Sequence, residues 1–190
     1  MTVPKNYAAL KKIYDALESD EKSYLIKLEP LLSDAKNYEI ALAYCYMKLE
    51  EGHHRALKCG LIRIHACDAR KVDEYLQKQH FTNKTYNSVF KNIIGTSIPS
   101  KAQSVHSDAQ EIRNKIIHGK SVSSPDLRSA IYYSLEYMRI VGELVKKKTG
   151  KNPYGNLQGL AGTKKLLPAK STIWMLKGFG IDGKDNATIA

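Results

Sequence analysis

The chain of 190 residues is long enough for one domain of ordinary size with a shorter appendage. Its 43% hydrophobic and 26% charged residues are close to the globular average, which excludes a wholly disordered chain. The formal net charge of +11 favours polyanionic partners, because a basic surface that neutralises phosphates releases counterions. Charge alone does not distinguish nucleic acid from an anionic membrane surface.

Three features of the sequence bear on the compartment. The longest apolar run, residues 40–47, contains two tyrosines and is far shorter than the ~18 residues of a membrane span. Residues 1–12 lack the apolar segment of a secretion signal. The three cysteines are odd in number and form no CxxC pair, which is typical of reduced thiols. We therefore expect a cytoplasmic protein that has no membrane partner.

The first half of the chain has the spacing of amphipathic helices almost throughout. Apolar residues recur along one helical face in 7–17. A second, short helix opens at 19–21 and is disturbed at Pro30. A long helix is expected over 37–67, and a further helical piece over 69–79.

Two more long helices are predicted after a weakly patterned connection. Residues 81–100 favour a short helix within that connection. A buried helical stripe follows, in a helix that opens at Ser100 or Ser107, since both begin a capping box, and that ends at Gly119. The last long helix has Ser124 as its N-cap.

Composition changes after residue 148. Seven of the twelve glycines lie in 150–190, and residues 146–190 hold nine lysines against two acidic residues. We therefore expect an all-α protein. A helical bundle of four to five helices would span residues 1–148, and a basic, irregular C-terminal extension would span residues 149–190.

The C-terminal extension is not uniformly polar. Residues 166–181 contain Trp174 and other large apolar side chains, which a disordered linker would not ordinarily carry. We expect part of this segment to dock on the bundle or on a partner, with residues 172–176 forming a short strand.

Two candidate chemistries fail on their spacing. The histidines and cysteines between residues 53 and 67 include no pair at the i, i+3 or i, i+4 spacing that a helical metal site needs. The glycine-rich segment 155–165 is similar to a phosphate loop, but no glycine lies five positions before Gly162 and no Ser or Thr follows Lys164. We therefore expect neither a metal nor a cofactor.

The remaining candidate is the segment 113–119, Arg-Asn-Lys-Ile-Ile-His-Gly. Its arginine lies late in an amphipathic helix, and its histidine lies just before the expected stop. Arginine is permanently cationic and matches phosphate through paired hydrogen bonds, whereas histidine titrates near neutrality. In a simpler interpretation, Arg113 pairs with Asp108 or Glu111 on a solvated face and His118 only caps the helix.

The Arg-x4-His motif, with Asn directly after the Arg and Gly directly after the His, resembles that of the HEPN superfamily. The resemblance covers about 107–144, and residues 5–80 are similar in architecture only. It implies a helical bundle and, in many members, a metal-independent endoribonuclease that acts as a toxin or in phage defence. Other members are non-catalytic binding modules. One branch has a Tyr two positions after the His, where this chain has Lys120.

The resemblance also implies roles for the residues. Metal-free RNA cleavage needs a base for the 2′-hydroxyl, an acid for the leaving 5′-oxygen and positive charge beside the phosphorane. Arg113 would stabilise the phosphate and the transition state, His118 would be the general base or acid, and Asn114 would orient the His or contact the substrate. The candidates for further RNA contacts are Lys115, Lys120, Lys164 and Lys165.

Helix geometry restricts how Arg113 and His118 act together. Five residues place them ~140° apart around the axis, so the Arg reaches round, the last turn unwinds, or a second copy contributes. HEPN ribonucleases are similar to the case in which a second copy contributes. We therefore expect a homodimer that binds RNA, and an antitoxin or another protein is expected as a further partner. Two alternatives are a non-catalytic module for nucleic acid or protein, and a DNA-associated accessory protein whose basic tail makes the main contact.

Overall fold

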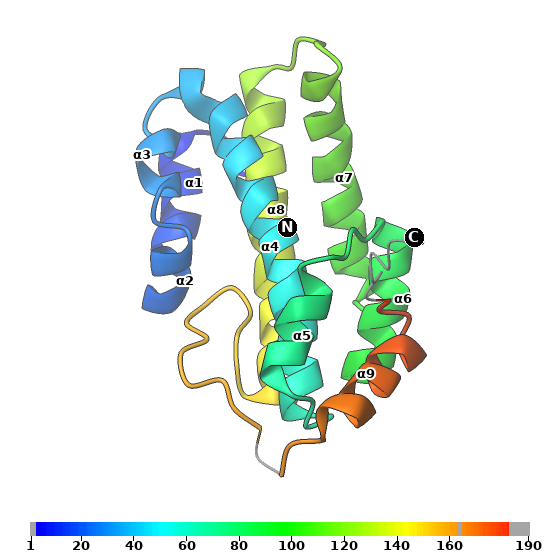
Figure 1. Ribbon diagram of the computed structural model, residues 1–190. Coiled ribbons are helices and arrows are strands. Elements are labelled where there is room, and N and C mark those ends of the chain that lie inside the picture. Colours follow the sequence, from blue (N-terminus) through cyan, green and yellow to red (C-terminus); the bar gives the residue numbers. More distant parts are fainter. Residues whose placement is uncertain (1–2, 163–164, 183–190) are drawn as a thin grey trace.

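The computed structural model describes residues 3–162 and 165–182, and this part of the chain is helical without any strand (Figure 1). Its helices are α1 (Tyr7–Asp15), α2 (Ser19–Tyr24), α3 (Leu28–Leu32), the 3-10 helix η1 (Ala35–Asn37), α4 (Tyr38–Arg63), α5 (Ala69–Leu76), α6 (Asn83–Ile94), α7 (Ser100–Ile117), α8 (Ser124–Thr149) and α9 (Ala169–Gly178). The all-α prediction is confirmed. The described helices outnumber the four or five expected, because short helices form before α4, between α4 and α7, and after α8. None of the described helices is long and apolar enough to cross a membrane.

Helix α8 is the centre of the molecule, since α4 and α7 both pack along it (Figure 1). Its apolar residues recur at three- and four-residue spacing, so they share one face of the helix. That face is fully buried, and its members are Leu127, Ile131, Leu135, Met138, Val141 and Val145. The N-terminal helices α1 and α3 cover α8 and α4 from one side, whereas α5, α6 and α9 lie around the other end of α4.

The helix boundaries lie close to the predicted ones, but two caps differ. Helix α7 starts at Ser100, the first of the two expected positions, although its N-cap is Pro99 and the expected capping box is not formed. Ser123, rather than Ser124, caps α8, because its side-chain oxygen accepts the N–H of Asp126 and Pro125 then lies in the first turn. Gly119 has φ +69°, so it ends α7 in the left-handed conformation that was predicted for it.

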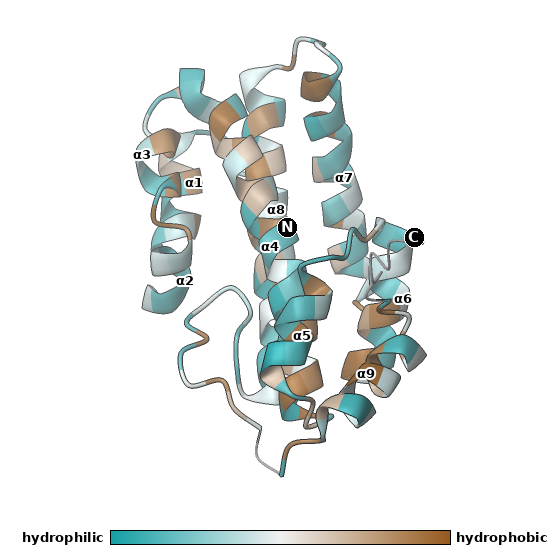
Figure 2. Ribbon diagram, in the orientation of Figure 1, coloured by the Kyte–Doolittle hydropathy of each residue, from teal (hydrophilic) through white to brown (hydrophobic). Residues whose placement is uncertain are grey.

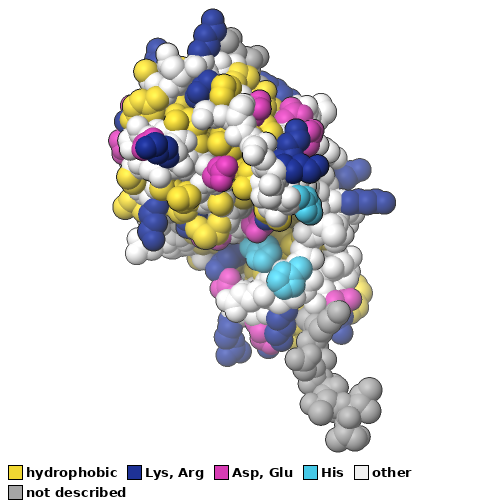
Figure 3. Space-filling model, turned by 90° about the horizontal axis from the view of Figure 1, so that it is seen from above, with side chains coloured by type: hydrophobic (Ala, Val, Ile, Leu, Met, Phe, Trp, Pro, Cys, Tyr) yellow, Lys and Arg dark blue, Asp and Glu magenta, His cyan; other side chains and the backbone are white. Residues whose placement is uncertain are grey.

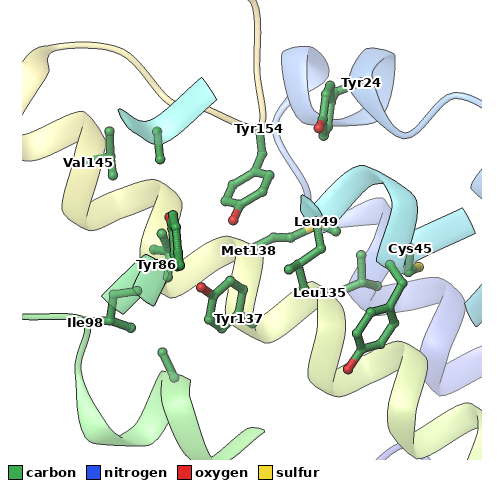
Figure 4. Packing of buried hydrophobic residues seen from close by; sticks show 14 of the residues in the cluster. Tyr24, Cys45, Leu49, Tyr86, Ile98, Leu135, Tyr137, Met138, Val145 and Tyr154 are labelled. Carbon is green, nitrogen blue, oxygen red and sulfur yellow. The ribbon is translucent and has the colours of Figure 1, made fainter. Parts of the chain in front are cut away.

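Two glycines of α4 allow close packing. A Cβ atom at Gly52 would overlap the ring of Tyr154, and one at Gly60 would lie 2.6 Å from side-chain atoms of Ile93 and Ile94. Tyr154 is only 1% exposed, and Figure 4 shows its ring inside the bundle, pointing toward Tyr137. The chain that follows α8 therefore supplies a core residue to the helices before it.

The C-terminal segment docks on the bundle, as predicted. Leu176 and Ile181 are fully buried, and the Thr172 hydroxyl accepts the backbone N–H of Asp68 at 3.1 Å. The expected strand at 172–176 is wrong, because these residues lie within α9, where apolar residues at helical spacing face α5. The extension is thus partly helical rather than irregular. Trp174 remains on the outer side of α9 and is 80% exposed.

Candidate functional site

The motif segment lies at the end of α7, where the chain turns into α8 (Figure 1). His118 is the C-cap, and the turn is closed by two backbone hydrogen bonds. The Gly119 N–H donates to the Ile116 carbonyl and the Lys120 N–H donates to the Lys115 carbonyl, both at 2.9 Å. This pair of bonds is the Schellman arrangement, which fixes the backbone on both sides of His118.

Arg113 is half-buried and points toward α4. Its guanidinium lies over the ring of Tyr46, 5.6 Å from the centroid, and its Nη1 donates to Asn114 Oδ1 at 3.4 Å. No carboxylate in the described ranges pairs with Arg113, whereas Glu111 pairs with Lys115 at 2.9 Å. The ion pairs expected from the simpler interpretation of Arg113 are therefore not formed, and the guanidinium is available to an anion.

His118 does not meet Arg113 within the chain. His118 is exposed, as are its neighbours Asn114, Lys115 and Lys120. Arg113 lines a cavity between α4 and α7, and His118 takes no part in that cavity. The helix is regular through Ile117, so the two side chains leave it in the different directions that their spacing requires.

The last turn of α7 also exposes apolar surface. Ile117, directly before His118, is 57% exposed, and this turn is hydrophobic in Figure 2. Seen from above, this end of the molecule gathers hydrophobic side chains, with Lys and Arg side chains around them (Figure 3). Ile40, near the start of α4, is similarly exposed. Exposed large apolar side chains beside charged ones are typical of surfaces that bind partners.

Sequence reasoning missed a histidine cluster next to Arg113. The cavity of about 450 Å³ that Arg113 lines is also bordered by four of the six histidines. They come from α4, from the connection before α6 and from α7, and they are His53, His54, His80 and His106. One signal was present in the sequence: His106, Gln110 and Arg113 follow i, i+4, i+7 spacing and so share a face of α7.

The buried members of the cluster are held as neutral rings. Burial lowers the pKa of His106 to about 4 and that of His53 well below its ordinary value. Burial and the nearby His80 lower the pKa of His54. His53 Nε2 lies 2.9 Å from the Tyr137 hydroxyl, and its ring stacks on Tyr86 with centroids 3.9 Å apart.

The cluster lacks the geometry of a metal centre. Within residues 3–162 and 165–182, no three His, Cys, Asp or Glu side chains converge closely enough to hold a metal ion. The thiols of Cys45, Cys59 and Cys67 are buried, and burial raises their pKa to about 12, 11 and 11. A thiol of such high pKa is a poor nucleophile.

The lysines proposed to bind RNA do not form one patch. Lys115 and Lys120 flank His118, but Lys165 precedes α9 at the opposite end of the molecule (Figure 1). Lys164 lies outside the described residues. Of the three proposed lysines that the structure describes, Lys115 and Lys120 are placed to contact an RNA strand that lies across the end of α7.

Comparison of the chain with protein-family models, with curated proteins and with solved structures finds no match. The motif at the end of α7 and the cavity beside it are therefore the basis for a functional assignment.

Proposed function

We propose that this protein is a metal-independent endoribonuclease of HEPN type. One observation carries the proposal. The segment Arg113–Gly119 ends a long helix in a fixed turn that exposes His118 and leaves Arg113 without a carboxylate partner in the described chain. An accessible histidine and an unpaired guanidinium supply a group for proton transfer and a positive charge, which are two of the three functions that metal-free phosphodiester cleavage requires.

Each residue of the motif then has a defined task. Arg113 binds the scissile phosphate and stabilises the extra negative charge of the phosphorane. His118 takes the proton of the 2′-hydroxyl or gives one to the leaving 5′-oxygen. Asn114, which accepts from Arg113 at 3.4 Å, orients that guanidinium or contacts the substrate.

The active unit in this proposal is a homodimer. Arg113 and His118 leave α7 in directions ~140° apart, so one protomer does not aim both at one phosphate. A second copy related by two-fold symmetry brings its own motif to the opposite side of the cleft. The 57% exposed Ile117 and the exposed Ile40 give this end an apolar surface for such a contact.

A second candidate is a non-catalytic binding module for nucleic acid or for a protein partner. The separation of Arg113 from His118 favours this binding module, because a binding surface does not require the two side chains to meet at one phosphate. In the cell, the ribonuclease would act as a toxin that has an antitoxin as its protein partner, or as a defence effector against phage.

The test is incubation of the purified protein with total RNA in excess EDTA. The proposal requires cleavage, with products that end in a 2′,3′-cyclic phosphate or a 3′-phosphate and begin with a 5′-hydroxyl. Strict dependence on Mg²⁺ or Mn²⁺ would contradict it. Binding of RNA without cleavage, unchanged by His118→Ala, would favour the non-catalytic module.

A further inference from the structure

The cavity beside Arg113 adjoins a second, smaller cavity. The first, called the outer part, has about 450 Å³ and opens between α4, α7 and residues 77–83. The second, called the inner part, has about 210 Å³ and reaches the buried rings of Tyr86 on α6 and Tyr137 on α8. The two parts share four lining residues, which are His53, Asn83, His106 and Gln110. The outer volume alone lies within the range of ~300–1,000 Å³ that is usual for small-molecule sites.

The inner part is polar but carries no formal charge. Buried His53 and His106 are neutral, so each offers one N–H donor and one nitrogen acceptor. Gln103, Asn87 and Ser107 add amide and hydroxyl groups, and none of the inner lining residues is acidic or basic apart from the histidines. The hydroxyl of Tyr86 is buried and has no hydrogen-bond partner in the described structure. Such a group is costly unless a bound molecule satisfies it.

Flat rings border the same space. The rings of Tyr46 and His106 are stacked with centroids 6.0 Å apart and planes 25° apart. His53 is stacked on Tyr86, and Phe81 meets His54 edge to face at 5.7 Å. The stacked faces of these rings are covered by one another, so the rings give the cavity flat walls against which a planar ligand packs.

The mouth of the cavity carries charges of both signs, with Arg113 as its anion-binding group. Arg113 lies there with its guanidinium over Tyr46, and exposed His80 lies on the rim. The acidic groups of the outer lining are Glu50 and Glu51, and Glu51 is paired with Lys48 and Arg55. The cavity therefore combines uncharged hydrogen-bonding groups and flat rings inside with an anion-binding group at its entrance.

We propose that this cavity receives a nucleobase of the RNA substrate while Arg113 holds the adjoining phosphate. This inference rests on the proposed function, and it adds a base-recognition subsite to the Arg113–His118 motif. A planar heterocycle with donors and acceptors on its edge fits the inner walls, and its phosphate fits the guanidinium. The bound base then fixes the phosphate beside Arg113, where His118 of a second copy reaches it.

The experiment measures binding in a His118→Ala background, so that the RNA stays intact. Gln110→Leu removes an amide that lines both parts of the cavity and accepts from Asn83 Nδ2 at 2.6 Å, and His106→Phe keeps a ring but removes its nitrogens. Gln158→Leu is the matched control, because Gln158 is exposed and lies on a different cavity. The probes are a short single-stranded RNA and the separate nucleoside monophosphates, and circular dichroism verifies the fold.

We expect Gln110→Leu and His106→Phe each to weaken RNA binding by about ten-fold or more, the effect of losing one hydrogen bond to the base, while Gln158→Leu binds normally. Equal RNA affinity of Gln110→Leu and the control would overturn the subsite. Nucleotide binding that depends on Gln110, with RNA binding unaffected, would assign the cavity to a free nucleotide and also overturn it. If the unmodified protein fails to cleave RNA in EDTA but Gln110→Leu still loses RNA binding, the ribonuclease proposal fails and the subsite stands.

Discussion

Helix α7 holds two histidines in opposite surroundings. His118 ends the helix, is exposed, and donates its backbone N–H to the Asn114 carbonyl at 3.0 Å. His106, about three turns earlier, is 9% exposed and packs among side chains from α4 and α8. The same residue type is therefore available for proton transfer at one point of the helix and is part of the folded core at another.

The comparison separates two ways in which a site is encoded. The exposed end of α7 is built from residues 113–120, which are neighbours in the chain. The surroundings of His106 are built from α4, α6, α7 and α8, which are brought together only by folding. Variants at the end of α7 should therefore change activity with little effect on stability, and variants in the interior should change stability first.

The largest effect is expected from His118→Ala on RNA cleavage. Loss of a general acid or base lowers the rate by ~100- to 10,000-fold. The free energy of unfolding should change by no more than ~0.5 kcal/mol, because the side chain is exposed. Cleavage assays beside urea denaturation measure both quantities, and undiminished cleavage would remove His118 from the site.

The next effect is an acid-dependent loss of stability at His106. Burial lowers its pKa to about 4 in the folded protein, whereas the pKa of an unfolded histidine is about 6.5. The unfolded chain therefore takes up the proton first as the pH falls. As the pH falls from 6.5 to 4, this difference in proton uptake should lower the free energy of unfolding by about 3 kcal/mol. Above pH 6.5 both states are unprotonated at His106, so the residue has no such effect. Buried His53 acts in the same direction.

Denaturation of His106→Gln at a series of pH values sharpens this prediction. The variant should lose stability less steeply below pH 6.5 than the unmodified protein. Ser104→Ala, on an exposed position of the same helix, retains every histidine and is the control. An identical pH profile for His106→Gln and the control would show that His106 is not held neutral by its surroundings.

A smaller loss of stability is expected from Gly52→Ala in the interior. The added Cβ overlaps the ring of Tyr154, which must shift. Overpacking of this kind costs about 1–3 kcal/mol. Gly178→Ala, where a Cβ meets nothing within 4 Å, is the matched control and should be neutral or slightly stabilising. Equal melting temperatures of the two variants would contradict the close packing of α4 against Tyr154.

The smallest effect concerns the salt dependence of RNA binding. A lysine that meets a phosphate contributes about 0.7 to the slope of log affinity against log salt for single strands. Lys120→Ala should lower the slope by about this amount, because Lys120 is exposed two residues after His118. Lys165→Ala should lower the slope by the same amount only if the bound RNA extends to the opposite end of the molecule. An unchanged slope for Lys120→Ala would place the RNA elsewhere.

The features that the sequence predicted are those that depend on neighbours in the chain. The buried stripe of α8 follows from apolar spacing, and the end of α7 follows from Gly119, a residue that adopts positive φ at little cost. Ser123 and Ser124 are chemically alike, so the pattern could not decide which of them caps α8.

The features that it missed depend on contacts between distant residues. Nothing near Gly52 indicates that Tyr154 fills the space above it. Residues 172–176 are rich in β-branched and apolar side chains that suit a strand, but residues 3–162 and 165–182 contain no strand that they could pair with, and they fold as part of α9 on α5. The histidines of the cavity are too scattered in the chain for their spacing to predict a shared site.

The composite site of the proposed dimer is the central claim, and complementation tests it most directly. Arg113→Ala and His118→Ala should each be inactive as separate proteins. In a mixed dimer, the His118→Ala copy supplies Arg113 and the Arg113→Ala copy supplies His118. One of the two composite sites is therefore intact.

The measurement is therefore RNA cleavage in EDTA by the two inactive variants mixed in equal amounts after subunit exchange, with light scattering to establish the dimer. Random exchange makes half of the dimers mixed, each with one of two sites intact, so we expect about a quarter of the unmodified activity to return. A mixture that forms dimers but stays inactive, or an unmodified protein that cleaves RNA at full rate as a monomer, would contradict the composite site.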